Sequence, residues 1–382
     1  MRGTAAVEVI AVTSRAQKSA FLHLPKSIYA SDPNWIAPLD IERRIHFDQR
    51  KNPFFHHAEG QFFLALEGDR PVGRISAHVD HLHLERYGDA TGQFGFLEAI
   101  DRQEVFAALL SRAENWLKER GLRRVQGPFS FSINDESGLL VHGFEHPPAI
   151  MMNHARPYYG DRIVAEGYVK AKDLIAYRYY SNTPVPPAIQ SMIAKSRASG
   201  KLVVRPFSKR HFARDLAIII DIFNDAWSTN WHFVPMTPAE IKNLGDILKF
   251  LVKNEHIAIA FYEDEPAAMI VTLPDINRMC RDLGGRLLPL GWAKLLWRLN
   301  FATHEAFRVP LLGVRKKFRS SAVSSMLAVA VMDAIRAFHV GRGTYPGELS
   351  WILEDNLPTR RLLEAIGGQH YKTYRIYEKS FA

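Results

Sequence analysis

The sequence predicts an α/β (α+β) protein built of two similar lobes, each a mixed twisted sheet flanked by helices. Its 382 residues exceed the roughly 100–200 that are typical of one domain. Three prolines within four positions interrupt regular structure near the middle of the chain. The same order of helices and strands occurs on both sides of them. We therefore predict lobes at residues 1–180 and 188–382, joined by a proline-rich linker at 181–187.

The first half shows the apolar spacing of both helices and strands. Gly121 follows one helix as its C-cap, and the turn Glu67–Arg70 joins two strands into a hairpin. The predicted helices span residues 16–30, 102–120 and 158–166, and the predicted strands span 60–66, 71–79, 92–98, 123–131 and 168–179.

The second half repeats this order and adds an insertion at 275–300. Thr237, Pro238 and Glu240 form a helix start with a capping box. The segments that follow Gly167 and Gly367 are weakly similar, which indicates an old duplication. The predicted strands span 201–206, 256–262, 266–273, 309–314, 348–353 and 371–378, and the predicted helices span 211–229, 237–252, 322–339 and 359–366.

Composition limits the classes of function. The single cysteine, Cys280, excludes a disulfide scaffold and a multi-cysteine metal site. The net charge of +9 favours an anionic partner: a phosphorylated cofactor, an anionic membrane, an acidic carrier protein or nucleic acid. We find no secretory signal and no membrane-spanning run. We therefore expect a cytoplasmic protein, with peripheral contact to the inner membrane left open.

The segment Arg315–Ser324 is the strongest candidate for a ligand site. It follows an apolar strand, is basic and rich in small residues, and leads directly into a long helix. Backbone N–H groups at a helix N-terminus, with cations beside them, bind a diphosphate. The alternative is that its serines only cap the helix.

This order of strand, basic turn, long helix, strand and Asn-x-x-Thr helix ending at Gly367 resembles the acyl-CoA-binding core of the Gcn5-related N-acetyltransferase (GNAT) superfamily. The resemblance implies acyl-CoA as the acyl donor. We expect no metal, because the histidines lack the spacing of a metal site. The tyrosine that often serves as an acid in that superfamily is Leu363 here, so that role is not assigned. The donor-binding residues that the resemblance implies are Val314, Lys317, Phe318, Arg319, Ser320, Ser321, Ala322, Val323, Ser324 and Asn356.

Acylation of an amine requires a base and donors for the thioester oxyanion. Side chains alternate along a strand, so Glu348 and Glu354 are predicted to share one face of the strand 348–356 and are the candidate bases. The backbone N–H groups of Gly313 and Val314 are the candidate oxyanion donors. The alternative is that both carboxylates are solvated or paired in salt bridges.

The first half has no basic turn before its helix 102–120, so we expect it to bind no diphosphate. Its polar loop contains Asn134, Asp135 and Glu136, which we interpret as part of a substrate wall together with Trp292 and Trp351. An ordered structural loop is the alternative. The histidines of this half lack the spacing of a metal site.

The insertion at 275–300 combines leucines and tryptophans with cations. Residues 284–299 contain no acidic side chain. This composition suits a lipid interface. A wall for a long acyl chain and an ordinary packed amphipathic helix are the alternatives.

Five stretches distributed over both halves make the chain similar to two-lobed bacterial proteins of the GNAT superfamily that act as ceramide synthases. The resemblance implies transfer of a fatty acyl group from an acyl-CoA or acyl carrier protein to the amine of a sphingoid long-chain base, in sphingolipid biosynthesis. The stretches are 32–35, 51–55, 127–138, 348–356 and 371–377.

Two other functions stay open. One is an acetyl-CoA-dependent N-acetyltransferase of a small amine or peptide. The other is a non-catalytic module that binds an acyl carrier or nucleic acid. Nucleic acid is the least favoured partner, because the basic residues gather at one loop instead of forming a stripe with aromatic residues between them.

Overall fold

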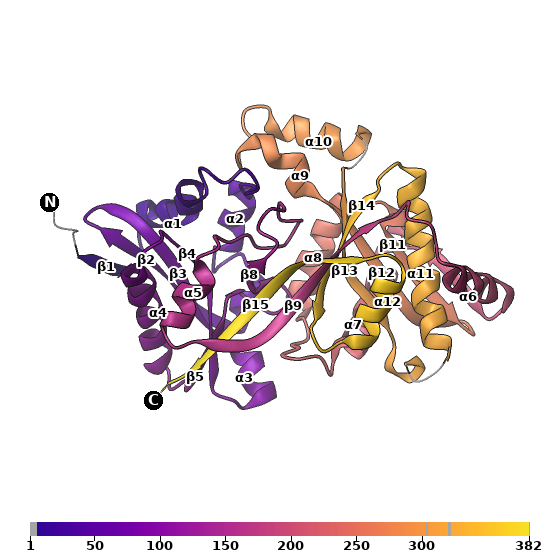
Figure 1. The fold of residues 1–382 in the computed structure, drawn as a ribbon, viewed down its shortest axis with the longest axis horizontal. Coiled ribbons are helices and arrows are strands. Elements are labelled where there is room, and N and C mark those ends of the chain that lie inside the picture. Colours follow the sequence, from indigo (N-terminus) through magenta and orange to yellow (C-terminus); the bar gives the residue numbers. More distant parts are fainter. Residues whose placement is uncertain (1–5, 303–304, 320–321, 382) are drawn as a thin grey trace. The chain divides into compact units, whose positions relative to one another are not determined.

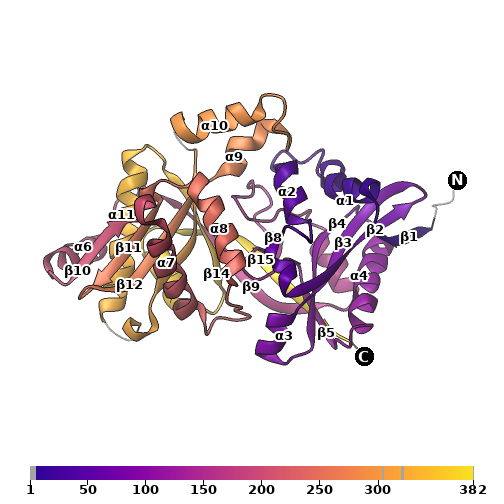
Figure 2. The same ribbon diagram turned by 180° about the vertical axis from the view of Figure 1, so that it is seen from behind.

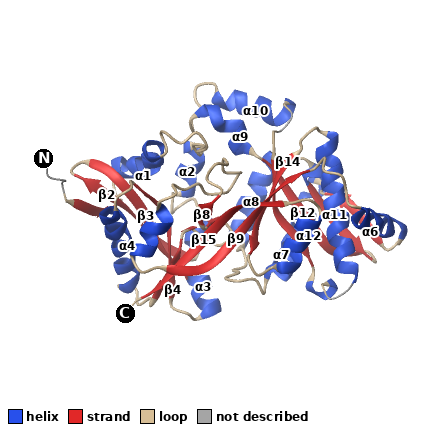
Figure 3. Cartoon of the chain, viewed as in Figure 1, coloured by secondary structure: helices blue, strands red, loops and turns tan. Residues whose placement is uncertain are grey.

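The computed structural model describes residues 6–302, 305–319 and 322–381. The chain forms two compact units (Figure 1), and both contain helices and a mixed sheet (Figure 3). Unit 1 consists of Met1–Leu174, Cys280–Leu288 and Lys372–Ala382, and unit 2 of Ile175–Met279 and Pro289–Tyr371. The predicted fold class is confirmed.

These units differ from the predicted lobes in where segments belong. The change from unit 1 to unit 2 falls inside strand β9 (Val169–Tyr180), before the predicted linker. The last strand, β15 (Gln369–Ser380), enters unit 1 at Lys372, and its residues Tyr377–Ser380 pair antiparallel with β5 (Arg124–Gly127). The ladder of β15 with a distant strand sets its unit, and local sequence does not encode that pairing.

The sheet of unit 1 has the strand order β1-β2-β3-β4-β5-β15, and β8 also pairs with β15. Its pairs are antiparallel except for β4 with β5, which is parallel. Besides β5 and β15, its strands are β1 (Val7–Ala11), β2 (Ala58–Glu67), β3 (Arg70–Asp80), β4 (Thr91–Ala99) and β8 (Leu139–His142), while β6 (Phe129–Ser130) pairs with β7 (Glu136–Ser137).

Helices α1 (Arg15–Ile28) and α4 (Gln103–Lys118) pack on this sheet. Phe21 of α1 lies in an aromatic cluster with Phe62, Phe96 and Phe131. Three short helices complete unit 1, namely α2 (Asp40–His46), α3 (His81–Tyr87) and α5 (Tyr159–Ala165).

The sheet of unit 2 has the order β9-β14-β13-β12-β11-β10. Strands β13 and β14 pair in parallel. The pairs β13 with β12, β12 with β11 and β11 with β10 are antiparallel. Its strands are β10 (Leu202–Pro206), β11 (Ile257–Tyr262), β12 (Glu265–Pro274), β13 (Phe307–Val314) and β14 (Pro346–Leu353). Its main helices are α6 (Pro187–Ala198), α7 (Phe212–Trp227), α8 (Pro238–Leu251), α11 (Ala322–Gly341) and α12 (Leu357–Ala365). The predicted capping box of Thr237 and Glu240 begins α8.

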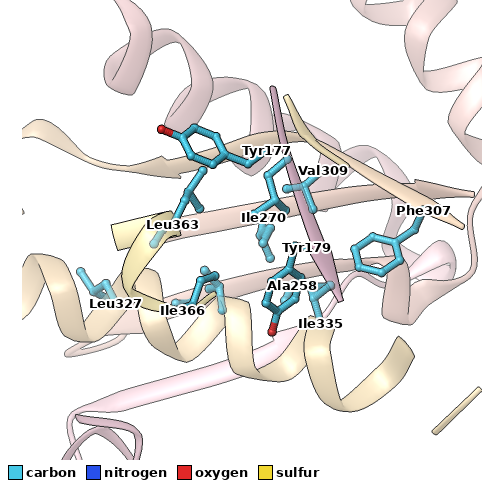
Figure 4. Packing of buried hydrophobic residues seen from close by; sticks show 14 of the residues in the cluster. Tyr177, Tyr179, Ala258, Ile270, Phe307, Val309, Leu327, Ile335, Leu363 and Ile366 are labelled. Carbon is cyan, nitrogen blue, oxygen red and sulfur yellow. The ribbon is translucent and has the colours of Figure 1, made fainter. Parts of the chain in front are cut away.

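The two faces of β13 contact different helices. Phe307 and Val309 pack with Leu327 and Ile335 of α11 (Figure 4). A side chain at Gly313 would meet Trp227 of α7 at 2.5 Å, so α7 packs closely on the other face. The two faces of β13 therefore contribute to different parts of the site described below.

Helix α11 is long and apolar enough to cross a membrane by length and composition (Val323–Gly341). Its contacts with β11, β12 and β13 are those of a core helix, because Leu327, Val331 and Ile335 are buried in the cluster of unit 2.

The insertion between β12 and β13 contains α9 (Ile276–Cys280), a 3₁₀ turn (Arg281–Leu283) and α10 (Gly291–Phe301). Figures 1 and 2 show α10 lying apart from the strands of unit 2.

Several short elements were not predicted, including β1, α2, α3 and α6. They are short or lack a long periodic pattern, so their sequence signal is weak. Pro187, assigned to the linker, is the first residue of α6. The predicted strand 123–131 is two strands, β5 and β6, separated at Pro128.

Candidate active site

The strands β13 and β14 separate at the centre of unit 2. Their parallel pairing covers only Phe307, Arg308 and Val309, opposite Gly347, Glu348 and Leu349. The next residue of β13 is Pro310, which has no N–H to donate. The register of β13 against β12 also shifts here, as a bulge does. Beyond this rung β13 continues beside β12 alone, which leaves a split on its other side.

Glu348, at the last but one rung, lies in a polar cluster. Its carboxylate accepts hydrogen bonds from the Tyr371 hydroxyl and, at 2.5 Å, from Ser350 Oγ. Arg308 Nε donates to Ser350 Oγ at 2.9 Å and lies 4.0 Å from Glu348 Oε1. Cross-strand register places Arg308 opposite Glu348, and alternation along β14 places Ser350 on the same face.

This cluster is almost completely buried. Glu348 is 4% exposed and Arg308 is 3% exposed. A buried ion pair of this kind requires hydrogen bonds to offset its desolvation, and two hydroxyl groups supply them here. Tyr371, which donates to the carboxylate, is itself only half-buried. Chemically, the arrangement is a carboxylate that exchanges protons through a phenol and a serine hydroxyl.

Glu354 does not extend this cluster along the strand. The strand β14 ends at Leu353, so the predicted alternation stops before Glu354. Its backbone carbonyl accepts a 2.9 Å hydrogen bond from Arg360 of α12. The prediction that Glu348 and Glu354 share one strand face is therefore wrong, because the chain turns toward α12.

Gly313 and Val314 lie farther along β13, where they pair with Met269 and Ala268 of β12. At about 3.3 Å per residue, Gly313 lies about 16 Å along the strand from Arg308. One carbonyl therefore cannot contact both Glu348 and the Gly313 amide. The bulge at Val309 and Pro310 is closer to Glu348 than either predicted oxyanion donor.

The basic turn after β13 is partly bonded to its surroundings. The amides of Phe318 and Arg319 donate to carbonyls inside a 3₁₀ turn, at 3.0 Å each. Lys317 forms an ion pair with Glu265, and its side chain is about half exposed. The Arg319 guanidinium donates to the carbonyl of Ala226, and burial lowers its pKa. Two of the predicted amide donors thus already have acceptors.

The start of α11 keeps the other predicted donors. Ala322, Val323 and Ser324 are its first residues, and the first four N–H groups of a helix have no acceptor within it. With 20 residues, α11 directs a substantial dipole to this end. Ser320 and Ser321 lie outside the described residues. The donor set fits an anionic group at the helix start.

Asn356 has a structural role in α12. Its side chain accepts from the amide of Thr359 at 3.3 Å and caps the helix. Leu363, at the position of the superfamily's tyrosine acid, is buried in the core of unit 2.

The predicted wall residues of the first half lie in unit 1. The Asp135 carboxylate accepts a hydrogen bond from Ser132 Oγ at 3.0 Å. Ser132 Oγ in turn accepts one from the backbone N–H of Asn134 at 3.1 Å. Glu136 pairs with Arg43. Burial alone would raise the pKa of Glu136, but Arg43 outweighs it and the pKa is lowered.

The two predicted wall tryptophans belong to unit 2. Trp351 is half-buried in β14, one residue after Ser350. Trp292 in α10 is 49% exposed and donates its indole N–H to the carbonyl of Pro289 at 3.0 Å.

A narrow apolar pocket lies on the α11 face of the same strands. About 620 Å³ of it is free of atoms, part of this open to solvent, but only about 50 Å³ admits the centre of a water molecule. The closed part of this apolar pocket is therefore small, and we refer to the pocket as the slot. It is lined by Val309 and Leu349 of the last rung, by α6 and α11, and by Ile366.

Sequence reasoning did not assign Arg308, Tyr371 or Pro310 to the site. A proline inside an apolar strand was the available signal for the split. Arg308 lies one residue before the predicted strand. Tyr371 contacts Glu348 only because strands that are separate in the sequence come together in the fold.

Two curated relatives match the chain over nearly its whole length. Protein YghO of Escherichia coli is 44% identical over 361 residues, which cover 94% of this chain and 92% of the relative. The bacterial ceramide synthase of Caulobacter vibrioides is 42% identical over 375 residues, which cover 98% and 97%. No protein-family model matches the chain.

Solved structures share the fold. A tandem GNAT protein from the clavulanic acid biosynthesis pathway has a TM-score of 0.55 and 9% identity, with 98% of each chain covered. A Gcn5-related N-acetyltransferase from Sphaerobacter thermophilus has a TM-score of 0.53 and 12% identity, with 98% of this chain and 95% of that chain covered.

The split strands, the helix that begins after the basic turn and the near full-length relatives agree with one another. The chain belongs to the family of the bacterial ceramide synthase and YghO. It has the two-lobed fold of tandem GNAT proteins, and it is an N-acyltransferase.

Proposed function

We propose that the enzyme transfers a fatty acyl group from an acyl thioester, an acyl-CoA or acyl carrier protein, to the amine of a sphingoid long-chain base. The observation that carries the reaction is the buried Glu348 cluster beside the split of β13 and β14. The name of the Caulobacter relative supports the choice of acceptor.

Glu348 is the base in this proposal. A long-chain amine arrives as an ammonium ion and must lose a proton before its lone pair attacks the thioester carbon. The proton passes through Tyr371 or Ser350, both of which donate to the carboxylate. Arg308 Nε lies 4.0 Å from Glu348 Oε1, so its positive charge faces the carboxylate.

Tyr371 is also the proposed acid. When the tetrahedral intermediate collapses, the C–S bond breaks and the thiolate needs a proton. The phenol supplies it and recovers a proton from Glu348, which took one from the amine. The nitrogen loses two protons in all: one reaches the thiolate through Glu348 and Tyr371, and the other leaves to solvent, so the products are an amide, a free thiol and one released proton. Tyr371 takes the place of the acid that Leu363 cannot provide.

The donor's diphosphate binds at the start of α11 in this proposal. The first-turn amides at Ala322–Ser324, the helix dipole and Lys317 support it. The bonded amides of Phe318 and Arg319 contribute less.

The apolar slot favours a fatty acyl group over acetyl. It borders Val309 and Leu349, so a chain that passes through the split reaches it directly. An acetyl group would leave this slot unfilled.

The test offers the purified enzyme acyl-CoAs of graded length, the matching acyl carrier proteins and a panel of amines. N-acylated products are identified by mass spectrometry. We expect long-chain acyl groups on a sphingoid base to give the highest kcat/KM. Turnover with acetyl-CoA and small amines alone would instead establish the acetyltransferase alternative.

A second measurement separates catalysis from binding. Donor binding is followed by calorimetry with a non-hydrolysable acyl-CoA analogue. Binding without turnover for any amine would favour the non-catalytic alternative.

A further inference from the structure

Helix α10 carries a row of large apolar side chains that are exposed to solvent. Leu290, just before the helix, is 72% exposed, Trp297 is 59% and Phe301 is 77%. Together with Lys294 they recur every three or four residues, so they share one helical face. A soluble surface seldom presents so many large apolar groups in one short segment.

The opposite face of α10 holds the helix to its own unit. Leu295 and Leu299 are buried. Arg298 donates to the carbonyl of Met279 in α9. The exposed row is therefore a stable feature of a packed helix, and its orientation is set by the buried face.

The segment around this face is positively charged. Residues 283–304 contain Arg286, Lys294 and Arg298 and no aspartate or glutamate. Tryptophan, phenylalanine and leucine beside cations match the chemistry of the interface between lipid headgroups and acyl chains. A phospholipid surface with negative charge complements both properties.

We propose that α10 docks the enzyme on an anionic lipid bilayer, with Leu290, Trp297 and Phe301 inserted among the acyl chains. Lys294, between them on the same face, lies at the level of the phosphates. This docking stands independently of the proposed acceptor, although a long-chain base in the same bilayer would be reached from it. The enzyme is then peripheral to the membrane.

Charge argues against a second copy of the chain as the occupant. In a symmetric contact each α10 would face itself, which places two segments of the same positive charge opposite each other. An anionic bilayer meets no such repulsion.

The test measures co-sedimentation of the full-length protein with vesicles. Vesicles of phosphatidylcholine with phosphatidylglycerol are compared with phosphatidylcholine alone, at low and high salt. We expect binding to the anionic vesicles, weakened by salt. The double variant Trp297→Ser/Phe301→Ser should bind at least about tenfold more weakly, and Lys294→Glu should lose the preference for anionic lipid.

Phe250→Ser provides the matched control. Phe250 of α8 is 62% exposed but lies outside the α10 segment, so its loss should leave vesicle binding unchanged. Equal melting temperatures of the variants confirm that the substitutions leave the fold intact.

Three results would overturn the docking proposal. They are absence of wild-type binding to anionic vesicles, binding by the double variant equal to that of the wild type, and a loss of dimers in the double variant in place of vesicle binding. Acyl transfer from a long-chain acyl-CoA to a sphingoid base, both dispersed in detergent without vesicles, is measured in parallel. Vesicle binding without such transfer would count against the proposed function and leave the docking proposal standing.

Discussion

Units 1 and 2 share a strand arrangement down to a local irregularity, yet in the described residues they differ in what lies where the parallel strands separate. In unit 1, the register of β4 shifts against β3 near Phe96, as that of β13 does against β12. Both strands then have a short parallel pairing with the next strand, β5 or β14. The fold is repeated up to this pairing, and the two units differ beyond it.

In unit 1 the chain itself fills the corresponding position. A side chain at Gly95 would meet the carbonyl of Phe129 at 1.7 Å, and one at Gly127 would meet that of Phe94 at 2.3 Å. Backbone packs on backbone there, which requires glycine. In unit 2 Pro310 ends the pairing instead. One fold thus supports a closed unit and an open one, and the site, not the fold, sets the activity.

Each unit has a strand glutamate that accepts hydrogen bonds from tyrosine: Glu98 in unit 1 and Glu348 in unit 2. Glu98 of β4 in unit 1 accepts hydrogen bonds from Tyr29 and Tyr159, at 2.7 and 2.8 Å. Burial raises its pKa. Glu348 has a comparable tyrosine and arginine environment, but it lies beside the split.

Exchanging these two carboxylates for amides tests the comparison most strongly. Glu348→Gln should lower kcat by about 10²–10⁴-fold, because the amide cannot take the ammonium proton. Glu98→Gln should lower the melting temperature but leave kcat of the folded enzyme nearly unchanged. Steady-state kinetics and thermal unfolding measure the two effects. Equal losses of kcat would show that unit 1 takes part in the chemistry.

The basic turn, which only unit 2 has, is expected to give the next largest effect. Lys317→Glu/Arg319→Glu should raise KM for acyl-CoA by about tenfold or more, because like charges repel the diphosphate. Lys317→Glu alone retains the Arg319 contact with Ala226 and tests the same idea if the double variant does not fold.

Lys51→Glu/Arg70→Glu makes the same charge change on exposed residues of unit 1 and serves as the control. Its KM should stay within about twofold of the wild type, since exposed charges are screened. A similar rise of KM in both double variants would indicate a general charge effect, not a site.

The slot of unit 2 should determine acyl chain length. Ile193→Trp fills the space between α6 and α11, so kcat/KM for long-chain donors should fall about tenfold while that for short-chain donors is unchanged. Lys195→Trp, at an exposed position of α6, is the control. An equal decrease of kcat/KM for donors of all chain lengths would show that the acyl chain does not bind in the slot. Competition between two acyl-CoAs measures the ratio.

Acid should destabilise unit 1 through its buried His78. Burial lowers the pKa of His78 in unit 1 to about 4, below the 6.5 of an exposed imidazole. As pH falls from 6.5 to 4, the unfolded chain gains a proton that folded unit 1 does not, which costs unit 1 about 3 kcal/mol. Asp215 in unit 2 has a pKa of about 2, because Arg205 and Arg214 outweigh its burial. Its stabilisation is complete above pH 4 and is lost as pH falls through 2.

Hydrogen exchange of peptides from each unit at pH 7 and pH 4.5 measures this difference. Protection should fall in β3 and change little in α7. His78→Gln should make the protection of unit 1 depend less on pH. An equal loss of protection in both units would mean that they unfold together.

Much of the fold followed from local patterns. The apolar spacing of 102–120 and 322–339 predicted α4 and α11, and the capping box at Thr237 fixed the start of α8. These signals lie within one or two turns of each element. Short α6 and the sheet-edge strand β1 lacked such a signal.

The candidate site was only partly predictable. Glu348 was identified as a strand carboxylate, but its neighbours Arg308 and Tyr371 are contributed by other strands. Alternation extended past Leu353, where β14 ends, groups Glu354 with it. Local sequence also has no signal for how far the Gly313 amide lies from Glu348, because that distance depends on which residues of β13 and β14 pair.

The sequence by itself determined the two-fold order of elements, the family and the position of the basic turn, because periodicity, caps and motifs are local properties of the chain. The tertiary structure decided which strands pair, where Pro310 opens β13 from β14, and that unit 1 is closed by its own backbone. Those features depend on contacts between segments far apart in the chain, whose free energy no short window of residues contains.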